Sequence, residues 1–256
     1  MTDTTITSQN KDSLLITGAS SGLGREIALR LSVDHRLILG GRDEERLQRS
    51  LADCCSPDKH LVWRHDLKDV DGIAEGLADF LAAHHVHVAG LVHCAAQLNV
   101  LPLRSLMPAM VRDSFQANVL SAMELVRTLT KKRINQQRLS SVVFISSIAS
   151  RFGAKGFSAY SATKGALDAL MKSLAVELAP EVRVNSVLPG ALRTAMTESM
   201  FRDPQIAGRM AADYPLGIGL PSDVVDAVEF LLSDKARWIT GQQFVVDGGR
   251  TTNITA

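Results

Sequence analysis

The stretch AYSATK, residues 159–164, holds a phenol and an ammonium group four residues apart. Tyr160 and Lys164 lie in a run typical of a helix, and residues at positions i and i+4 share one helix face. A unit charge about 4 Å from a phenolic oxygen, at an effective dielectric constant of about 20, is worth roughly 4 kcal/mol. Such a charge would lower the pKa of the Tyr160 hydroxyl by about three units from its usual value of about 10. The pair could therefore exchange a proton with a substrate, although an ordinary surface pair has the same spacing.

A glycine-rich loop could hold a phosphate group. Residues 17–24 read TGASSGLG, directly after an apolar run and directly before a helical run that begins near Arg25. A strand, a glycine turn and a helix N-terminus together present free backbone N–H groups to a pyrophosphate. The spacing is G-x-x-x-G-x-G rather than the G-x-G-x-x-G of the standard fingerprint, and a tight structural turn is the alternative interpretation. The residues that we expect to contact a dinucleotide here are Gly18, Ser20, Ser21, Gly22, Leu23 and Gly24.

The end of the second predicted strand indicates which dinucleotide is bound. An acid about 20 residues beyond the glycines is expected to bind the ribose of NAD(H), whereas an arginine there suits the 2′-phosphate of NADP(H). The chain has Gly41 followed by Arg42, whose guanidinium can bind a phosphate through two hydrogen bonds. Asp43 is a competing candidate for the ribose, but we interpret it as the N-cap of the next helix. We therefore expect NADP(H) to be favoured over NAD(H), with a solvated surface charge at Arg42 as the alternative.

Composition and spacing argue against several classes of partner. Lys and Arg number 28 against 27 Asp and Glu, so a net charge of +1 gives no field that would attract nucleic acid or an anionic membrane. Three cysteines without framework spacing fit a reducing compartment, and no apolar run approaches the roughly 20 residues of a membrane span. His84, His85 and His87 resemble a metal cluster, but alternation along a strand would separate them. The sequence therefore predicts a cytoplasmic protein that binds no metal, nucleic acid or membrane.

Seven short apolar runs alternate with longer helical patterns along the chain. This rhythm predicts a doubly wound α/β fold, a Rossmann-type seven-stranded parallel sheet with helices on both faces. We expect one domain over residues 12–256, preceded by a flexible tail over 1–11, with an irregular substrate lid at about 190–221. The predicted strands cover residues 14–17, 36–40, 60–65, 88–95, 141–146, 182–188 and 243–247. The predicted helices cover residues 23–32, 44–53, 68–83, 112–135, 158–178 and 222–233.

Five ordered motifs carry a family resemblance that covers nearly the whole chain. They are TGASSGLG, FISSIAS, YSATK, VNSVLPG and ITGQQFVVDGG, and they look like the short-chain dehydrogenase/reductase family. The resemblance implies hydride transfer with NAD(P) and a catalytic tetrad that matches here as Asn118, Ser147, Tyr160 and Lys164. Ser147 would donate a hydrogen bond to the substrate oxygen, and Lys164 would contact the nicotinamide ribose. Asn118 would bend its helix and hold a water, although a simple helix kink is the alternative for this residue.

Further positions match the family's cofactor site. The resemblance places Asp66 beside the adenine, with a helix N-cap as the alternative, and places NSVLPG against the nicotinamide. The family typically reads NNAG after the fourth strand, whereas this chain has HCAA at residues 93–96. We expect that Cys94 braces the neighbouring strands poorly and that the adenosine pocket is slightly altered, with binding retained. The further cofactor contacts that the resemblance implies are Asp66, Leu67, Cys94, Ala95, Tyr160, Lys164, Pro189, Gly190 and Thr194.

The leading functional hypothesis is an NADP(H)-dependent oxidoreductase that acts on a small carbonyl or alcohol substrate. The NADP(H)-preferring 3-oxoacyl-[acyl-carrier-protein] reductases look similar, and the basic run KKR at 131–133 could contact an acidic carrier. Against this, Val176 stands where those reductases usually have arginine. A non-catalytic NADP(H)-sensing regulator is an alternative from another class, although all four tetrad positions are present. The apolar content of the helices at 112–135 and 158–178 predicts a homo-oligomer, a tetramer or dimer.

Overall fold

The structure is a computed structural model, and it describes residues 12–201, 208 and 211–252. Seven strands form one sheet in the order β3-β2-β1-β4-β5-β6-β7, with every neighbouring pair parallel. The predicted seven-stranded fold is confirmed, while the predicted tail over 1–11 and part of the predicted lid lie outside the described residues. The strands are β1 (Asp12–Thr17), β2 (Leu37–Gly41), β3 (Leu61–Arg64), β4 (His87–His93), β5 (Ser141–Ile145), β6 (Arg183–Pro189) and β7 (Gln243–Val246).

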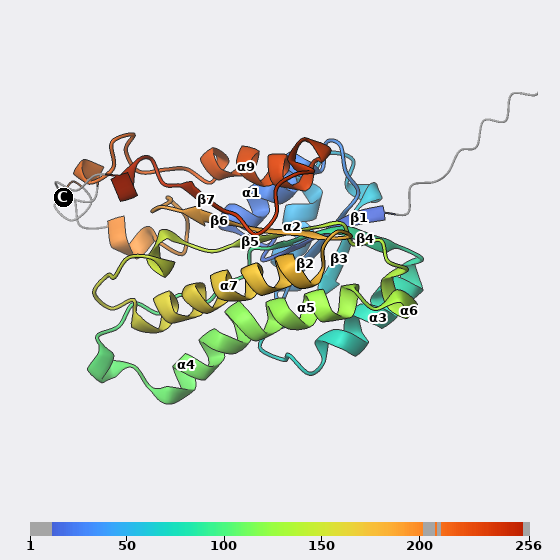
Figure 1. The fold of residues 1–256 in the computed structure, drawn as a ribbon, viewed down its shortest axis with the longest axis horizontal. Coiled ribbons are helices and arrows are strands. Elements are labelled where there is room, and N and C mark those ends of the chain that lie inside the picture. Colours follow the sequence, from blue (N-terminus) through green and yellow to red (C-terminus); the bar gives the residue numbers. More distant parts are fainter. Residues whose placement is uncertain (1–11, 202–207, 209–210, 253–256) are drawn as a thin grey trace, which may run out of the picture.

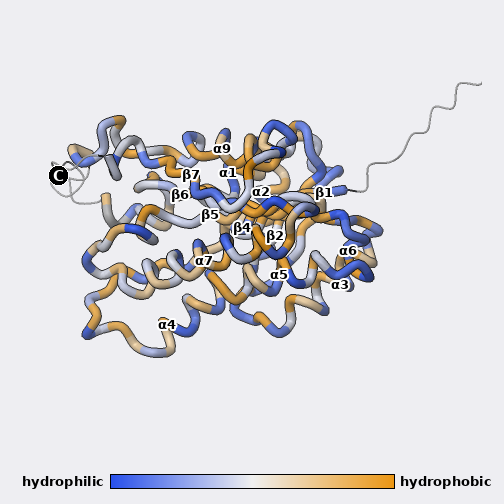
Figure 2. Tube along the Cα trace, viewed as in Figure 1, coloured by the Kyte–Doolittle hydropathy of each residue, from blue (hydrophilic) through white to orange (hydrophobic). Residues whose placement is uncertain are grey.

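Alternating strand residues build two apolar cores, one on each face of the sheet. Along β1, Leu14 and Ile16 belong to one core and Leu15 to the other, because successive side chains of a strand point to opposite faces. Figure 1 shows helices above and below the sheet, and Figure 2 shows apolar residues concentrated along the strands between them. The helices on one face are α1 (Gly22–Leu31), α2 (Glu44–Ala52) and α9 (Ser222–Leu232). The principal helices on the other are α3 (Ile73–His84), α5 (Ser121–Leu129) and α7 (Ser158–Glu177).

Helix α3 begins later than the sequence pattern predicts, at Ile73 rather than near residue 68. Two aspartate side chains stabilise turns in the residues that precede the helix. Asp66 Oδ1 accepts a hydrogen bond from Lys68 N at 3.1 Å, and Asp69 Oδ1 accepts one from Gly72 N at 3.2 Å. Aspartate side chains bond the backbone of nearby residues in this way and so compete with helix formation.

The single helix predicted over 112–135 is divided into four segments. Helix α4 (Pro108–Phe115) runs into a π-helical segment (Gln116–Leu120), which continues as α5, and the short α6 (Lys132–Asn135) follows. The extended backbone of Lys131, with ψ 116°, separates α5 from α6. The widened π-helical segment is where the predicted site residue Asn118 lies. Such single-turn interruptions of a helix are frequent at functional sites.

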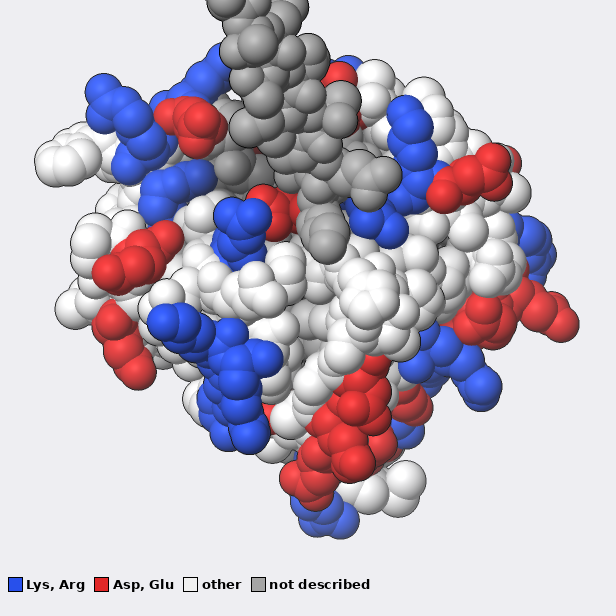
Figure 3. Space-filling view, turned by 90° about the vertical axis from the view of Figure 1, so that its right-hand side faces the viewer, with Lys and Arg blue, Asp and Glu red and all other residues white. Residues whose placement is uncertain are grey.

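The surface shown in Figure 3 carries charges of both signs. Lys and Arg side chains lie among Asp and Glu on this face, and neither sign dominates it. None of the helices in the described part of the chain combines the length and apolar character that crossing a membrane requires.

Candidate active site

A cavity of about 1140 Å³ extends along the carboxyl ends of the strands. This is where ligands bind in open parallel sheets. The cavity brings together all the predicted site residues except Asn118. The predicted residues that line it are Gly18, Ser20, Ser21, Gly22, Leu23, Gly24, Arg42, Asp66, Leu67, Cys94, Ala95, Ser147, Tyr160, Lys164, Pro189, Gly190 and Thr194.

The glycine loop makes one wall of this cavity and has no room for side chains. Gly18 has a φ of +72°, and a Cβ there would lie 2.8 Å from Ala95 N. A Cβ on Gly24 would lie 2.7 Å from the carbonyl carbon of Gly18, so this glycine lets α1 pack closely against the loop. Ser21 makes no side-chain capping bond at the start of α1. The first N–H groups of α1 therefore lack a side-chain cap and are available to an anion.

Arg42 follows β2 on the wall beyond the glycine loop. It is exposed, it lines the cavity together with Arg46, and it lines a smaller adjoining hollow with Arg64. Asp43 accepts a hydrogen bond from Arg46 N at 3.0 Å, which confirms the interpretation of Asp43 as the N-cap of α2. Asp66 caps a turn and not a helix, because α3 begins seven residues later at Ile73. The guanidinium groups of Arg46 and Arg64 near this wall are features that the sequence analysis missed.

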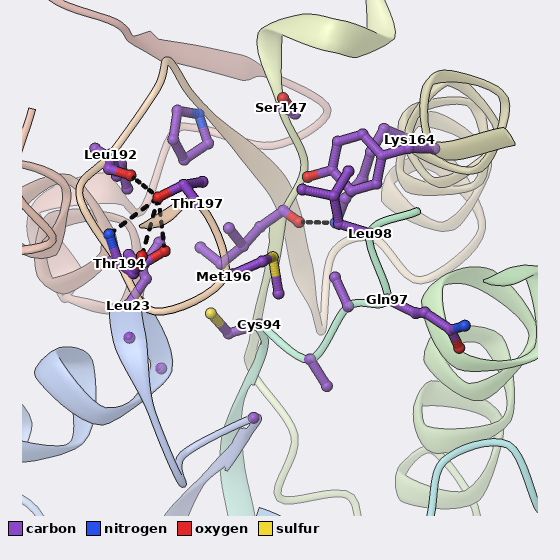
Figure 4. Close-up of a pocket in the computed structure, with 18 of the residues that line it drawn as sticks. Leu23, Cys94, Gln97, Leu98, Ser147, Lys164, Leu192, Thr194, Met196 and Thr197 are labelled. Atoms are coloured by element: carbon purple, nitrogen blue, oxygen red, sulfur yellow. Dashed lines mark hydrogen bonds between the residues drawn. The ribbon is translucent and has the colours of Figure 1, made fainter. Parts of the chain in front are cut away.

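Ser147, Tyr160 and Lys164 meet where β5 ends and α7 passes over the cavity. Ser147 Oγ accepts a hydrogen bond from Ala149 N at 3.1 Å, and its hydroxyl hydrogen can be donated to Tyr160 Oη or to a substrate oxygen. Lys164 is only 1% exposed, and its Nζ donates to Ile145 O at 2.7 Å. The same Nζ lies 5.5 Å from the centre of the Tyr160 ring. Figure 4 shows Ser147, Lys164, Cys94 and Met196 among the side chains that line this cavity.

The pKa of Tyr160 differs in direction from the sequence-based expectation. Burial raises the pKa of Tyr160 to about 12, and a hydrogen bond with Ser147 offsets this only in part. Burial also lowers the pKa of Lys164 to about 8. The predicted lowering of the Tyr160 pKa is therefore wrong for this structure, because burial of the phenol is the larger effect. Tyr160 carries its proton at neutral pH and can donate it.

Asn118 lies beneath the cavity and does not line it. Its side chain is fully buried and holds the backbone of Gln97 at both ends: Oδ1 accepts from Gln97 N at 2.7 Å, and Nδ2 donates to Gln97 O at 3.1 Å. Nδ2 also donates to Thr163 Oγ1 at 3.0 Å, next to Lys164. Asn118 thus ties the π-helical segment both to the cavity wall and to α7. That it holds a water stays a prediction.

The segment HCAA is braced by a residue that the sequence analysis missed. Thr17 Oγ1, at the end of β1, accepts hydrogen bonds from Cys94 N and Ala95 N at 3.2 Å each and contacts His93 Nδ1 at 3.1 Å. Thr17 therefore joins β1 to the end of β4, where Cys94 was expected to brace poorly. Burial raises the pKa of the Cys94 thiol to about 12, so it is a weak nucleophile. The one sequence feature that points to this bracing role is the position of Thr17 directly before the glycine loop.

The last cavity wall is the segment after β6. A Cβ on Gly190 would lie 2.8 Å from Tyr214 Cε1, and the Tyr214 hydroxyl accepts a hydrogen bond from Ala191 N at 2.9 Å. Thr194 N donates to Thr197 Oγ1 at 3.0 Å (Figure 4). Tyr214 and Thr197 fall in the predicted lid, but its sequence pattern did not single them out. No cluster of His, Cys, Asp and Glu suited to a metal ion occurs among the residues that the structure describes.

Comparisons with known proteins show what this chain is similar to. A family model described as enoyl-(acyl carrier protein) reductase matches residues 18–251. L-xylulose reductase of Bos taurus is 33% identical and carbonyl reductase [NADPH] 2 of Sus scrofa is 31% identical, each alignment covering 92% of this chain and 94% of the relative. The solved structure of a short-chain type dehydrogenase/reductase from Mycobacterium ulcerans has a TM-score of 0.85 at 30% identity, over 94% of this chain and 90% of that chain.

Proposed function

Since this chain belongs to the short-chain dehydrogenase/reductase family, we propose that it transfers hydride between NADP(H) and a small carbonyl or secondary alcohol. It is an oxidoreductase of C=O and CH–OH groups, as its relatives are named, and this argues against the alternative of a non-catalytic sensor. The observation that carries the proposal is that Ser147, Tyr160 and Lys164 share one cavity with the glycine loop.

The residues present fit a dinucleotide. Gly18 and Gly24 leave space where a Cβ would collide with backbone, and the N-terminus of α1 has no side-chain cap. The cofactor, when bound, supplies or accepts the hydride. We propose that the glycine loop would hold its pyrophosphate and that Pro189, Gly190 and Thr194 would hold its nicotinamide end. The remaining contacts would come from Asp66, Leu67, Cys94 and Ala95.

Tyr160 and Ser147 would act on the substrate oxygen. In the reducing direction, Tyr160 Oη donates the proton that a developing alkoxide needs, and its raised pKa keeps that proton in place at neutral pH. Ser147 Oγ donates a second hydrogen bond to the same oxygen, a preorganised contact that strengthens as negative charge develops there. Lys164 and Asn118 would support this arrangement, Lys164 through its charge and Asn118 through Gln97 and Thr163.

Three features support NADP(H) over NAD(H). Gly41 offers no acidic side chain to the adenosine ribose at the end of β2, and Arg42 follows it on the cavity wall. Arg46 and Arg64 add positive charge nearby, which suits a 2′-phosphate. The name of one relative, carbonyl reductase [NADPH] 2, specifies NADPH.

The acyl-carrier alternative gains no support from the position of the basic run. Asn135, the last residue of α6, bonds both Val88 N and Val88 O at the beginning of β4. Residues 131–133 therefore lie near the amino ends of the strands, whereas the cavity lies at their carboxyl ends. We also propose a homo-oligomer in the cytoplasm. Exposed Leu120 and Met123 on the α4–α5 helical face and exposed Val176 on α7 support subunit packing.

The proposed function is tested by NADPH oxidation against a panel of carbonyl compounds. The chain has only two tyrosines, and both line the cavity, so each serves as control for the other. We expect Tyr160→Phe to lower the rate about 100- to 10,000-fold, because it removes the proton donor. Tyr214→Phe removes a hydroxyl that, among the described residues, bonds only the Ala191 backbone, and we expect it to lose less than about tenfold. Equal rates for wild type and Tyr160→Phe would end the assignment.

A further inference from the structure

The part of the cavity beside Ser147 and Tyr160 has apolar walls. Phe152 and Met196 are each 51% exposed although they line the cavity, and the Phe157 ring stands edge-on to Tyr160 at 6.0 Å between ring centres. We name this part the substrate end. Its apolar lining residues are Leu98, Ala149, Phe152, Phe157 and Met196.

Thr197 and Tyr214 near the substrate end already have hydrogen-bond partners, and Gln97 points away from it. Thr197 Oγ1 bonds the Leu192 carbonyl and Thr194, as Figure 4 shows. The Tyr214 hydroxyl is taken by Ala191 N. The Gln97 side chain extends away from Ser147 and Lys164 (Figure 4). Within the described residues, Ser147 and Tyr160 therefore offer their hydroxyls to one substrate oxygen, while the other side chains offer few hydrogen bonds.

Arg250, which lines the cavity farther along, also has a partner of opposite charge. Arg250 Nη2 lies 3.6 Å from Asp213 Oδ2, so its charge is partly neutralised. Thr251 on the same wall donates its backbone N–H to Asp247 Oδ2 at 2.7 Å. A substrate carboxylate would have to compete with Asp213 for this guanidinium.

We infer that the substrate is an apolar ketone, or its secondary alcohol, whose only polar group within the substrate end is the reacting oxygen. The inference rests on the proposed function and adds the substrate class. Each methylene buried against Leu98, Phe152 or Met196 gains transfer free energy, equivalent to about a fourfold rise in kcat/KM. A polyhydroxylated substrate must remove its hydroxyls from water without replacement partners.

The test compares unbranched methyl ketones of four to eight carbons with the trihydroxylated form of the four-carbon ketone, each at saturating NADPH. The inference expects kcat/KM to rise about fourfold per methylene over at least three additions. It expects the trihydroxylated ketone to be at least about tenfold poorer than its parent. A flat series, or a trihydroxylated ketone that surpasses the eight-carbon one, overturns it.

Variants locate the effect. We expect Phe152→Ser to flatten the chain-length series, because it removes apolar surface from the substrate end. Val33→Ser replaces an apolar residue that is 62% exposed and does not line the cavity, and we expect it to keep the slope of wild type. A slope that Phe152→Ser leaves unchanged counts against the proposed location.

Binding measurements separate this inference from the proposed function. Alkyl carboxamides have a carbonyl but do not accept hydride, and calorimetry gives their Kd for the NADPH complex. The inference expects Kd to fall about fourfold per methylene, whether or not turnover occurs. A falling Kd without any NADPH oxidation would contradict the proposed function alone, whereas turnover with a constant Kd would overturn the inference alone.

Discussion

Thr17 donates a hydrogen bond to His93 across the β1–β4 pair, with Thr17 Oγ1 3.1 Å from His93 Nδ1. The direction follows from the other partners of the hydroxyl. Cys94 N and Ala95 N both donate to Thr17 Oγ1, at 3.2 Å each, and so occupy its two lone pairs. The one hydroxyl hydrogen is left for Nδ1, which must then be unprotonated. The neutral His93 ring therefore carries its proton on Nε2.

Acid should destabilise the protein through His93. Burial and the nearby charge of Lys164 lower the pKa of His93 from 6.5 to about 3. Between these values the unfolded chain binds a proton that the native state does not. The contribution of His93 to the unfolding free energy is therefore complete above pH 6.5 and is lost as pH falls toward 3. From pH 7 to pH 5, wild type should lose about 2 kcal/mol more unfolding free energy than His93→Asn.

Urea denaturation at both pH values measures this difference. His35→Asn, which changes an exposed histidine, is the control and should lose stability as wild type does. Parallel losses in His93→Asn and wild type would show that the imidazole accepts a proton in the native state, contrary to the network around Thr17.

Alkali should have the opposite effect through Lys164. Burial lowers the pKa of Lys164 from 10.5 to about 8, so the unfolded chain holds a proton between these values that the native state has lost. The contribution of this group to stability therefore rises with pH across that window, by on the order of 3 kcal/mol. Lys164→Met lacks this titration. We therefore expect the unfolding free energy of Lys164→Met, relative to that of wild type, to be lower at pH 10.5 than at pH 7 by on the order of 3 kcal/mol.

Denaturation curves of Lys164→Met, Lys172→Met and wild type at several pH values test this expectation. Lys172 is exposed on the same helix, so its variant should follow wild type throughout. A constant difference between Lys164→Met and wild type would mean that the native ammonium is solvated.

Gly24→Ala should open the glycine loop. A Cβ there would lie 2.7 Å from the Gly18 carbonyl carbon, and this contact is with backbone that cannot rotate away. We expect a loss of about 1–3 kcal/mol in stability and a weakened thermal shift on adding NADPH. Gly76→Ala is the control, because its Cβ would meet only His65 Nδ1, at 3.9 Å. That helical variant should gain up to about 1 kcal/mol. A Gly24→Ala protein with undiminished cofactor binding would contradict the close packing of loop and helix.

Arg42→Ala should change the choice of cofactor. Losing a charge-assisted contact to the 2′-phosphate would weaken NADPH binding about 10- to 100-fold, while NADH binding changes little. Fluorescence titration with both cofactors measures the ratio. Arg49→Ala, on α2 but away from the cavity, should keep the ratio of wild type. If Arg42→Ala weakens both cofactors equally, the arginine does not read the phosphate.

Short-range chemistry made the fold and the glycine loop predictable from sequence alone. All seven strands lie close to where the apolar runs place them, because a parallel strand buried on both faces needs a continuous apolar run. Gly18 and Gly24 follow from the demands of a strand–turn–helix joint. The pairing of Tyr160 with Lys164 follows from the period of a helix, since both lie on α7.

Only the tertiary structure decided how those groups are charged and held. Burial raises the pKa of Tyr160. Several segments distant in the sequence bury this side chain together, and the helix period does not reveal which they are. Asn118 bonds Gln97, 21 residues before it, and Thr163, 45 residues after it. Thr17 braces residues 76 to 78 positions away. These contacts depend on which strands become neighbours, and local residue patterns carry no record of that choice.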